Sequence, residues 1–190
     1  MTPFALTSER LRLDPPAASD AARIVEYCQD PLFERFLATP WPYQPADAAG
    51  FIESFVPDGW ASGTEYTWAV RSGTGAPLIG VIGLRREAPG VANLGFWIGA
   101  PHRGRGYMTE AVRLVSAWAF RDGGVETLKW ECYLRNAASA AVARKVGFRY
   151  VGTGPADLAD RDGRHREAWH GVLTAELQAQ PPAAVEDWPV

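Results

Sequence analysis

The turn that follows Ile98 combines glycine, arginine and a helix start in a way that suits an anion. Gly104 and Gly106 stand beside Arg103 and Arg105, and a helical pattern begins directly afterwards. Glycines let backbone N–H groups approach a ligand closely, and the first turn of a helix adds N–H groups without internal partners. Guanidinium groups add fixed charge that matches phosphate oxygens. We therefore expect a phosphate-binding turn, with the Arg103 side chain on its solvent side.

Three interpretations of this turn are open. It can be a solvated basic connection between a strand and a helix. It can be a dinucleotide-binding G-x-G-x-x-G segment, but Thr109 occupies the third glycine position and several strands precede the turn. It can also bind the pyrophosphate of a different cofactor, and this interpretation needs support from the rest of the chain.

A second group of polar residues lies further along the chain. On the strand expected at 128–134, Glu131 and Tyr133 project to one side, and Trp130 and Cys132 project to the other. Asn136 and Ser139 follow where this strand gives way to a helix. Their spacing of three places both side chains on the same side of that helix, and Asn136 also suits the helix N-cap.

The elements that position these residues follow from apolar periodicity and capping signals. Strands are expected at 4–13, 66–71, 78–84, 91–98, 128–134, 148–151 and 168–173. Helices are expected after Ser19-Asp20 and at about 45–56, 107–120 and 137–146. The aromatic segment 31–45 is broken by prolines, and it is either a satellite of the core or a wall on the substrate side.

Composition limits the class of protein. With 190 residues, of which 47% are apolar, the chain can bury one good core and is most simply one domain. The formal net charge of −3 provides no overall basic field for nucleic acid. Two cysteines without a paired framework or metal spacing favour a reducing, cytoplasmic location. No run of about 18 apolar residues suggests a membrane span.

Several segments resemble, in order, the GNAT N-acetyltransferases and in particular their RimJ/RimL branch. Arg103 and Gly106 match the acyl-CoA-binding loop, Arg/Gln-x-x-Gly-x-Gly/Ala, while Met108 stands where glycine or alanine is usual. Asp14 stands where that branch usually has arginine. The matching segments are 7–13, 94–98, 104–111, 118–120, 136–139 and 145–148, and the resemblance extends over about residues 5–176.

The resemblance implies the GNAT fold, of the α/β (α+β) class, with a mixed central β-sheet of about seven strands flanked by helices on both faces. Residues 1–178 then form a single GNAT N-acetyltransferase domain, and 179–190 form a Pro-rich C-terminal tail. The implied activity is transfer of an acetyl group from acetyl-CoA to a primary amine, by direct attack on the thioester. The acceptor is either a small-molecule amine or a protein N-terminal amine.

The resemblance also implies residues for coenzyme A. The strand that ends at Ile98 meets the pantetheine arm, the turn holds the pyrophosphate, and Asn136 hydrogen-bonds the pantetheine amides. The expected cofactor-binding residues are Phe96, Trp97, Ile98, Arg103, Gly104, Arg105, Gly106, Tyr107, Met108, Thr109, Asn136, Ser139 and Lys145. No metal is expected.

Catalytic roles are implied for Ser139, Asn136 and Glu131. Many family members carry a tyrosine that protonates the leaving thiolate, but Ala143 occupies that position here, which makes Ser139 the available hydroxyl. A glutamate base is often found where this chain has Asn93, so Glu131 is the candidate base. Ordered water can also take the proton, and each of these residues has an ordinary structural interpretation.

Two other functions stay open. One is a CoA-binding regulatory module without turnover, and the other is transfer from another acyl-CoA such as succinyl-CoA. The expected partners are acetyl-CoA and an amine, with a homodimer as a further possibility and with neither nucleic acid nor a membrane.

Overall fold

The computed structural model describes residues 1–182, 184 and 187–188. The strands are β1 (Leu6–Thr7), β2 (Arg12–Asp14), β3 (Glu65–Arg71), β4 (Leu78–Ala88), β5 (Gly90–Ile98), β6 (Val125–Tyr133), β7 (Arg149–Pro155) and β8 (Glu167–Leu173). The α-helices are α1 (Ala21–Cys28), α2 (Pro31–Phe36), α3 (Pro45–Gly50), α4 (Val56–Ser62), α5 (Tyr107–Arg121), α6 (Ala137–Val146) and α7 (Ala175–Gln178). Short η turns cover 18–20, 51–55 and 100–102.

The strands form one mixed sheet in the order β1-β2-β3-β4-β5-β6-β8-β7. Every neighbouring pair is antiparallel except β5 and β6, which are parallel. The expected mixed sheet is thus confirmed, with eight strands where about seven were expected. The single strand expected at 4–13 is wrong, because a turn at Ser8 folds β1 back on β2 and pairs Leu6 with Leu13.

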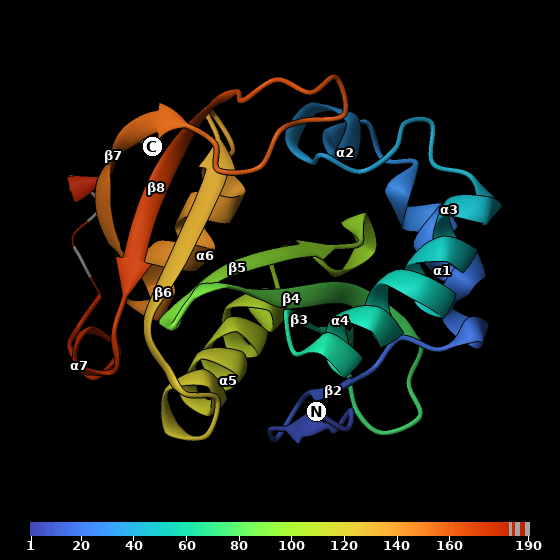
Figure 1. Cartoon of the computed structure of the whole chain (residues 1–190), viewed down its shortest axis with the longest axis horizontal. Helices are drawn as coiled ribbons and strands as arrows, with labels where there is room; N and C mark the ends of the chain where they lie inside the picture. The colour runs from blue at the N-terminus through green and yellow to red at the C-terminus, as the bar shows by residue number, and fades with distance from the viewer. Residues whose placement is uncertain (183, 185–186, 189–190) are drawn as a thin grey trace.

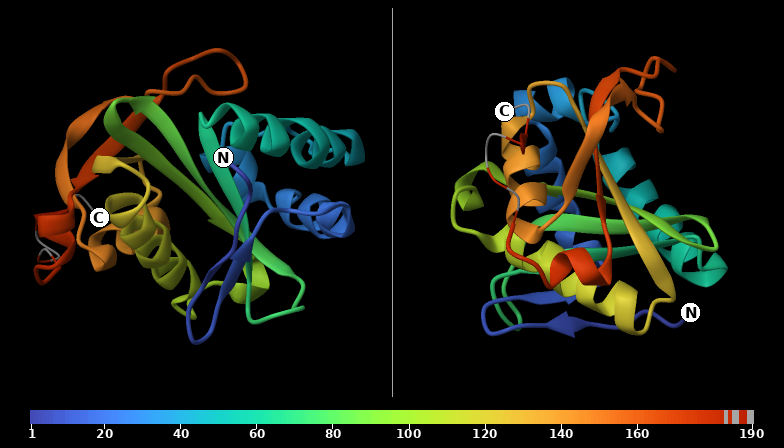
Figure 2. Two further views of the ribbon diagram at one scale, coloured as in Figure 1. Left: turned by 60° about the horizontal axis from the view of Figure 1, so that its bottom comes forward. Right: turned by 90° about the vertical axis from the view of Figure 1, so that its left-hand side faces the viewer.

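Helices cover both faces of the sheet, as expected (Figures 1 and 2). On one face, α5 and α6 pack on the larger core, whose central side chains include Trp68, Ile82 and Leu128. On the other face, α1 and α3 pack on a second core around Ala69 and Val81. α5 buries residues spaced three and four apart, which is the pattern that predicted this helix.

Two helical regions differ from the expectation. The helix expected at 45–56 continues to Ser62, and a π turn over 51–55 joins α3 to α4 just before Pro57, which has no N–H to donate. The segment expected to be broken contains α2. This helix begins with Pro31 in its first turn, and the Asp30 carboxylate accepts the Leu32 N–H at 2.9 Å.

Part of the segment expected to be a C-terminal tail packs against the domain. Trp188 is only 5% exposed, and its ring lies 5.7 Å from that of Trp130 and 6.0 Å from that of Tyr150. Residues 183, 185–186 and 189–190 of that segment lie outside the described residues.

Candidate active site

The parallel pair β5–β6 is joined over only part of its length. The register runs from Gly90 opposite Val125 to Asn93 opposite Lys129. Beyond this point the two strands part, and Figure 1 shows β5 and β6 as the arms of a V. Strands that part in this way stop pairing with each other, so their backbone groups become available to a ligand.

A groove of about 470 Å³ extends from this opening. Its walls come from α2, the end of β5, the turn at 102–106, the first turn of α5, and α6. Twelve of the thirteen expected cofactor-binding residues line it: Phe96, Trp97, Ile98, Arg103, Gly104, Gly106, Tyr107, Met108, Thr109, Asn136, Ser139 and Lys145. Arg105 is exposed and does not line the groove.

The turn on one side of the groove depends on two glycines. Gly104 and Gly106 have φ values of 75° and 78°, in the left-handed region that other residues rarely adopt. Gly106 is the N-cap of the fifteen-residue helix α5 and provides no side-chain cap. The N–H groups of the first helical turn therefore lack internal partners and face the groove with the positive end of the helix dipole.

A polar cluster fixes the start of α5. The Glu110 carboxylate in the first turn accepts the Ser8 hydroxyl at 2.6 Å and the Arg10 Nε–H at 2.7 Å. Arg10 Nη1 also donates to the Arg105 carbonyl at 3.4 Å, and its guanidinium lies over the Tyr107 ring. The turn between β1 and β2 therefore supports the 103–106 turn from outside.

The Arg103 side chain is not on the solvent side, contrary to the expectation. Its Nη1 pairs with the Asp30 carboxylate at 2.7 Å, and its Nε donates to the Ile98 carbonyl at 3.2 Å. Arg103 therefore joins the turn to the N-terminus of α2. Lys145, at the end of α6, is exposed and lines the groove, so it supplies positive charge from the opposite wall.

The end of β5 provides side chains from both faces of the sheet. Phe96 and Ile98 pack against the larger core, whereas Trp97 meets Phe33 of α2 edge-on, with ring centroids 5.3 Å apart. Met108, where the family usually has a smaller residue, is 4% exposed and belongs to the larger core. Its side chain is thus held largely within the protein.

Asn136 and Ser139 lie together at the start of α6, as their spacing predicted. Asn136 is the N-cap, and its Oδ1 accepts the Ser139 N–H at 3.2 Å. This bond does not use the Asn136 Nδ2 donor. The Ser139 Oγ lies 3.2 Å from Trp130 Nε1, and both Asn136 and Ser139 line the groove. Ala143 is buried in the same helix.

Glu131 does not line the groove. Its carboxylate accepts the backbone N–H of Asp157 at 2.7 Å and that of Leu158 at 3.4 Å. The Nδ1 of His170 lies 3.7 Å from Glu131 Oε2. These contacts hold the loop after β7 and occupy both carboxylate oxygens.

Of the three histidines, His102 lines the groove. Its Nε2 lies 2.8 Å from the Tyr27 hydroxyl. Burial lowers the pKa of His102, and the positive charges of Arg105 and Arg23 lower it further. With its pKa lowered, the His102 imidazole is neutral at pH 7.

The α2 wall is the part of the groove whose role the sequence left open. The groove is lined here by Leu32, Phe33, Phe36 and Leu37, and Phe33 is also buried in the second core. The segment therefore packs on the core and forms a wall of the groove, and its position on the substrate side stays a prediction. Asp30 followed by Pro31 is a helix-start signal that could have located this wall in the sequence.

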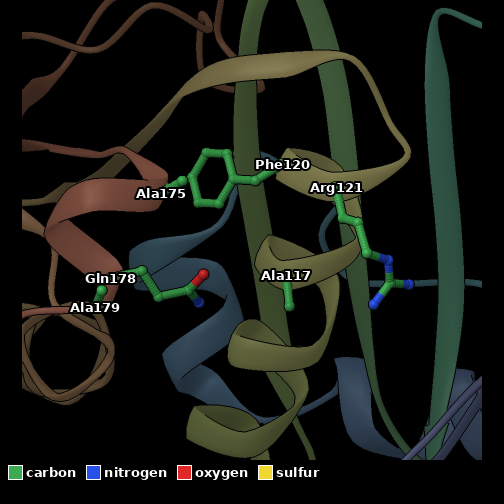
Figure 3. Close-up of a pocket in the computed structure, with 6 residues that line it drawn as sticks. All are labelled: Ala117, Phe120, Arg121, Ala175, Gln178 and Ala179. Atoms are coloured by element: carbon green, nitrogen blue, oxygen red, sulfur yellow. The ribbon is translucent and has the colours of Figure 1, made fainter.

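A second hollow lies between α5 and α7 (Figure 3). Its lining residues are Ala117, Phe120, Arg121, Ala175, Gln178 and Ala179. The Arg121 side chain extends away from the other five and pairs with Asp122 at 2.6 Å. The lining therefore brings together no set of groups suited to anion binding or proton transfer, and the groove remains the candidate site.

In the part of the chain that the structure describes, no helix is both long and apolar enough to cross a membrane. The same residues contain no group of three or more His, Cys, Asp or Glu side chains placed to hold a metal ion.

Comparison with sequences of known proteins identifies one family and one relative. Residues 10–149 match the model of the acetyltransferase (GNAT) domain. Over 91 residues the chain is 34% identical to the "Probable N-acetyltransferase YjcK" of Bacillus subtilis (strain 168). That match covers 46% of this chain and only 50% of the relative.

Solved structures share the fold over most of the chain. A Vibrio cholerae protein assigned as a ribosomal-protein-serine acetyltransferase superposes with a TM-score of 0.80 at 23% identity, covering 92% of this chain and 99% of the other. The RimL acetyltransferase in complex with coenzyme A gives 0.77 at 17%, covering 93% and 100%. A microcin self-immunity acetyltransferase in complex with acetyl-CoA and AMP gives 0.75 at 19%, covering 88% and 93%.

These structures, all under 25% identical to this chain, show that it shares their fold. The family match covers well over half of the chain, including β5, the turn, α5 and α6, which together form most of the groove. The chain is a member of the GNAT acetyltransferase family.

Proposed function

We propose that this protein transfers an acetyl group from acetyl-CoA to a primary amine, and that the groove beside the β5–β6 opening is the site of transfer. The observation that carries the proposal is that one groove unites an anion-binding helix start, an open β-strand edge, and the Asn136–Ser139 pair. Family membership and the acetyl-CoA or CoA held by proteins of similar fold support it.

The residues of the groove fit the parts of coenzyme A. The N–H groups at the start of α5, with Lys145 opposite, suit the pyrophosphate. The open edge of β5 suits the amides of the pantetheine arm, and the Asn136 Nδ2 donor suits their carbonyls. Acetyl-CoA supplies an activated acyl carbon and a thiolate leaving group.

The chain's own groups can assist three stages of this reaction. Groove walls that hold the amine against the acyl carbon supply much of the rate through orientation. A backbone N–H at the open end of β5 stabilises negative charge on the carbonyl oxygen while the N–C bond forms. The Ser139 hydroxyl then donates to the sulfur as the C–S bond breaks. Because Glu131 is engaged with backbone N–H groups, water takes the proton that the amine loses.

The direct test is release of the CoA thiol with a panel of small amines and short peptides with free N-termini. Thiol release that depends on an amine supports the proposal, and mass spectrometry of the product identifies the acyl group and the acceptor. CoA binding without release from any member of the panel would instead indicate a binding module. Faster release from succinyl-CoA than from acetyl-CoA would change the donor.

Ser139→Ala tests the role of the hydroxyl. We expect kcat to fall about ten- to a hundredfold, at the low end for general acid catalysis, since a thiol with a pKa near ~8.5 needs only modest help to leave. The CoA dissociation constant should change little. Ser116→Ala is the matched control, because this serine lies buried in α5. A Ser139→Ala enzyme with the kcat of the wild type would contradict the proposed role.

A further inference from the structure

Trp130 lies behind Ser139, on the side away from the groove. It belongs to β6, is 1% exposed, and directs its Nε1–H at the Ser139 Oγ, 3.2 Å away. The ring occupies space that Gly171 leaves open on the neighbouring strand β8, where an added Cβ would lie 3.2 Å from Trp130 Cε3. The indole is therefore fixed by packing and does not depend on a ligand.

The direction of this hydrogen bond determines what the serine can do. An indole N–H only donates, whereas a serine hydroxyl carries one proton and two lone pairs. When Ser139 Oγ accepts from Trp130, its own proton remains available for an acceptor elsewhere. The backbone N–H of Ser139 is already given to Asn136 Oδ1, so both neighbours leave the hydroxyl proton free.

One competing acceptor lies on the protein side. The Cys132 side chain also has a hydrogen-bond interaction with Ser139, and its Sγ lies 3.7 Å from the Asn136 carbonyl oxygen. A protonated thiol is a weak acceptor, and burial raises the pKa of Cys132 to about 12, so it stays a thiol. A thiolate in the groove is a much stronger acceptor and would draw the hydroxyl proton to itself.

The C-terminal segment completes the support of Trp130. The ring centroid of Trp130 lies 5.7 Å from that of Trp188 and 6.5 Å from that of Phe148. Trp188 lies beyond residues 10–149, the region that matches the family model.

We propose that Trp130 is a positioning residue that makes Ser139 a hydrogen-bond donor toward the groove, and that Trp188 holds Trp130 in place. This inference rests on the proposed function for its role in acetyl transfer. The Ser139 hydroxyl is thereby prepared to stabilise the CoA thiolate before any substrate binds.

The first test is a double-mutant cycle with Trp130→Phe, which keeps a ring and removes the N–H. We expect kcat to fall about three- to tenfold in the wild-type background and not at all in the Ser139→Ala background, with CoA affinity kept. Trp60→Phe is the matched control, because Trp60 is also 1% exposed and its Nε1–H also donates over 3.2 Å, but to the backbone carbonyl of Thr67 in β3. This control should leave kcat unchanged.

The second test needs no turnover, so it separates this inference from the proposed function. The dissociation constants of CoA and acetyl-CoA are compared between pH 7 and 9.5, because only CoA has a thiol that ionises near ~8.5. In the wild type, the affinity for CoA should gain about tenfold relative to the affinity for acetyl-CoA as pH rises, because a hydrogen bond donated by Ser139 favours the thiolate. The pKa of His102 is lowered, so the groove's histidine is neutral throughout this range.

Trp130→Phe and Ser139→Ala should both reduce this gain to about twofold or less. Trp188→Ala, which leaves every strand intact, should give an intermediate gain. The inference would be overturned if Trp130→Phe showed the same pH-dependent gain in CoA affinity as the wild type. It would also be overturned if Trp130→Phe lowered kcat by the same factor in the wild-type and the Ser139→Ala backgrounds. A wild-type protein that shows the pH-dependent gain but no turnover would refute the proposed function alone.

Discussion

The anion-binding side of the groove depends on backbone conformation more than on charged side chains. Gly104 and Gly106 adopt left-handed conformations that aim N–H groups at the groove, while the guanidinium of Arg103 is occupied by Asp30 and Ile98. The positive φ of such a turn requires glycine, and this conformation leaves backbone N–H groups available to a ligand.

Gly106→Ala separates these two contributions when it is compared with Gly75→Ala. Gly75 has almost the same φ of 75°, with open space around it, but lies in the turn between β3 and β4. We expect both variants to lose about 1–2 kcal/mol in the free energy of unfolding, which is the cost of a left-handed alanine. Only Gly106→Ala should also lose CoA affinity, by about tenfold or more, as measured by calorimetry. Equal CoA affinity in the two variants would remove Gly106 from the site.

The two cysteines should be inert in the folded protein. Burial raises the pKa of both Cys28 and Cys132 to about 12, so neither is a thiolate at pH 8. We expect Ellman's reagent to detect fewer than about 0.2 thiols per chain in native protein within minutes, and two in denaturant. Rapid modification of the native protein would show that the region around one cysteine opens readily.

Residue roles were predictable where the signal is local. The Gly104–Gly106 turn, the Asn136 cap and the spacing to Ser139 are all contained in short stretches of sequence. The partners of Arg103 and Glu131 were not predictable, because Asp30 and the backbone of Asp157 reach them only through the tertiary fold. For the same reason the sequence did not reveal which face of β6 carries Glu131.

At the scale of elements, the loop between β7 and β8 is tied to α2 across the molecule. Arg161 Nη2 donates to the carbonyl oxygens of Glu34 at 2.8 Å and Leu37 at 2.9 Å, at the C-terminal end of that helix. Arg166 Nη1 donates to the Arg35 carbonyl at 2.9 Å. These bonds join the last strands to the wall of the groove, and Figure 1 shows the loop crossing toward α2.

Arg161→Ala should loosen both segments. Removing a charged donor from the last carbonyls of this helix costs about 1.5–3 kcal/mol locally, so hydrogen exchange of the 156–166 loop and of α2 should quicken about tenfold or more. Arg164→Ala, in the same loop but exposed, is the control and should leave exchange unchanged. If the two variants exchange alike, the Arg161 contacts do not hold the loop.

Element boundaries were least predictable where a break is hidden in a periodic pattern. The run 4–13 alternates as one strand should, yet the turn at Ser8 divides it. The helix expected at about 45–56 continues through the π turn to Ser62. In contrast, α6 has the expected bounds, because Asn136 caps its start and Gly147, with φ of 114°, ends it.

For the molecule as a whole, a buried ion cluster joins the first helix to the sheet. Arg71 at the end of β3 binds both oxygens of Asp20, at 2.7 and 2.8 Å, and donates to Asp14 at 2.6 Å. Burial by itself raises the pKa of Asp20, but hydrogen bonds from Arg71 and from the Ala17 N–H outweigh it and hold this pKa below its ordinary value.

Arg71→Met should lower the free energy of unfolding by roughly 3 kcal/mol at pH 7, because it leaves a buried carboxylate without its partner. Since the pKa of Asp20 is lowered in the folded state, the stabilisation is present above about pH 4 and is lost as pH falls through that lowered value. The difference between variant and wild type, measured by urea unfolding, should therefore shrink below pH 4. Arg12→Met, which removes a more exposed partner of Asp14, should cost under about 1 kcal/mol. A difference that is the same at pH 3 and pH 7 would rule out this account.

The parting of β5 and β6 also places a sheet edge inside the molecule. Edge strands with unpaired backbone groups invite addition of a foreign strand, and most proteins protect them with charge, proline or short length. Here the protection comes from α2, α6 and the anion-binding turn, which leave room for a slender, amide-bearing chain but not for another sheet. In the proposed function, the amides of the pantetheine arm therefore take the place of a neighbouring strand along this edge.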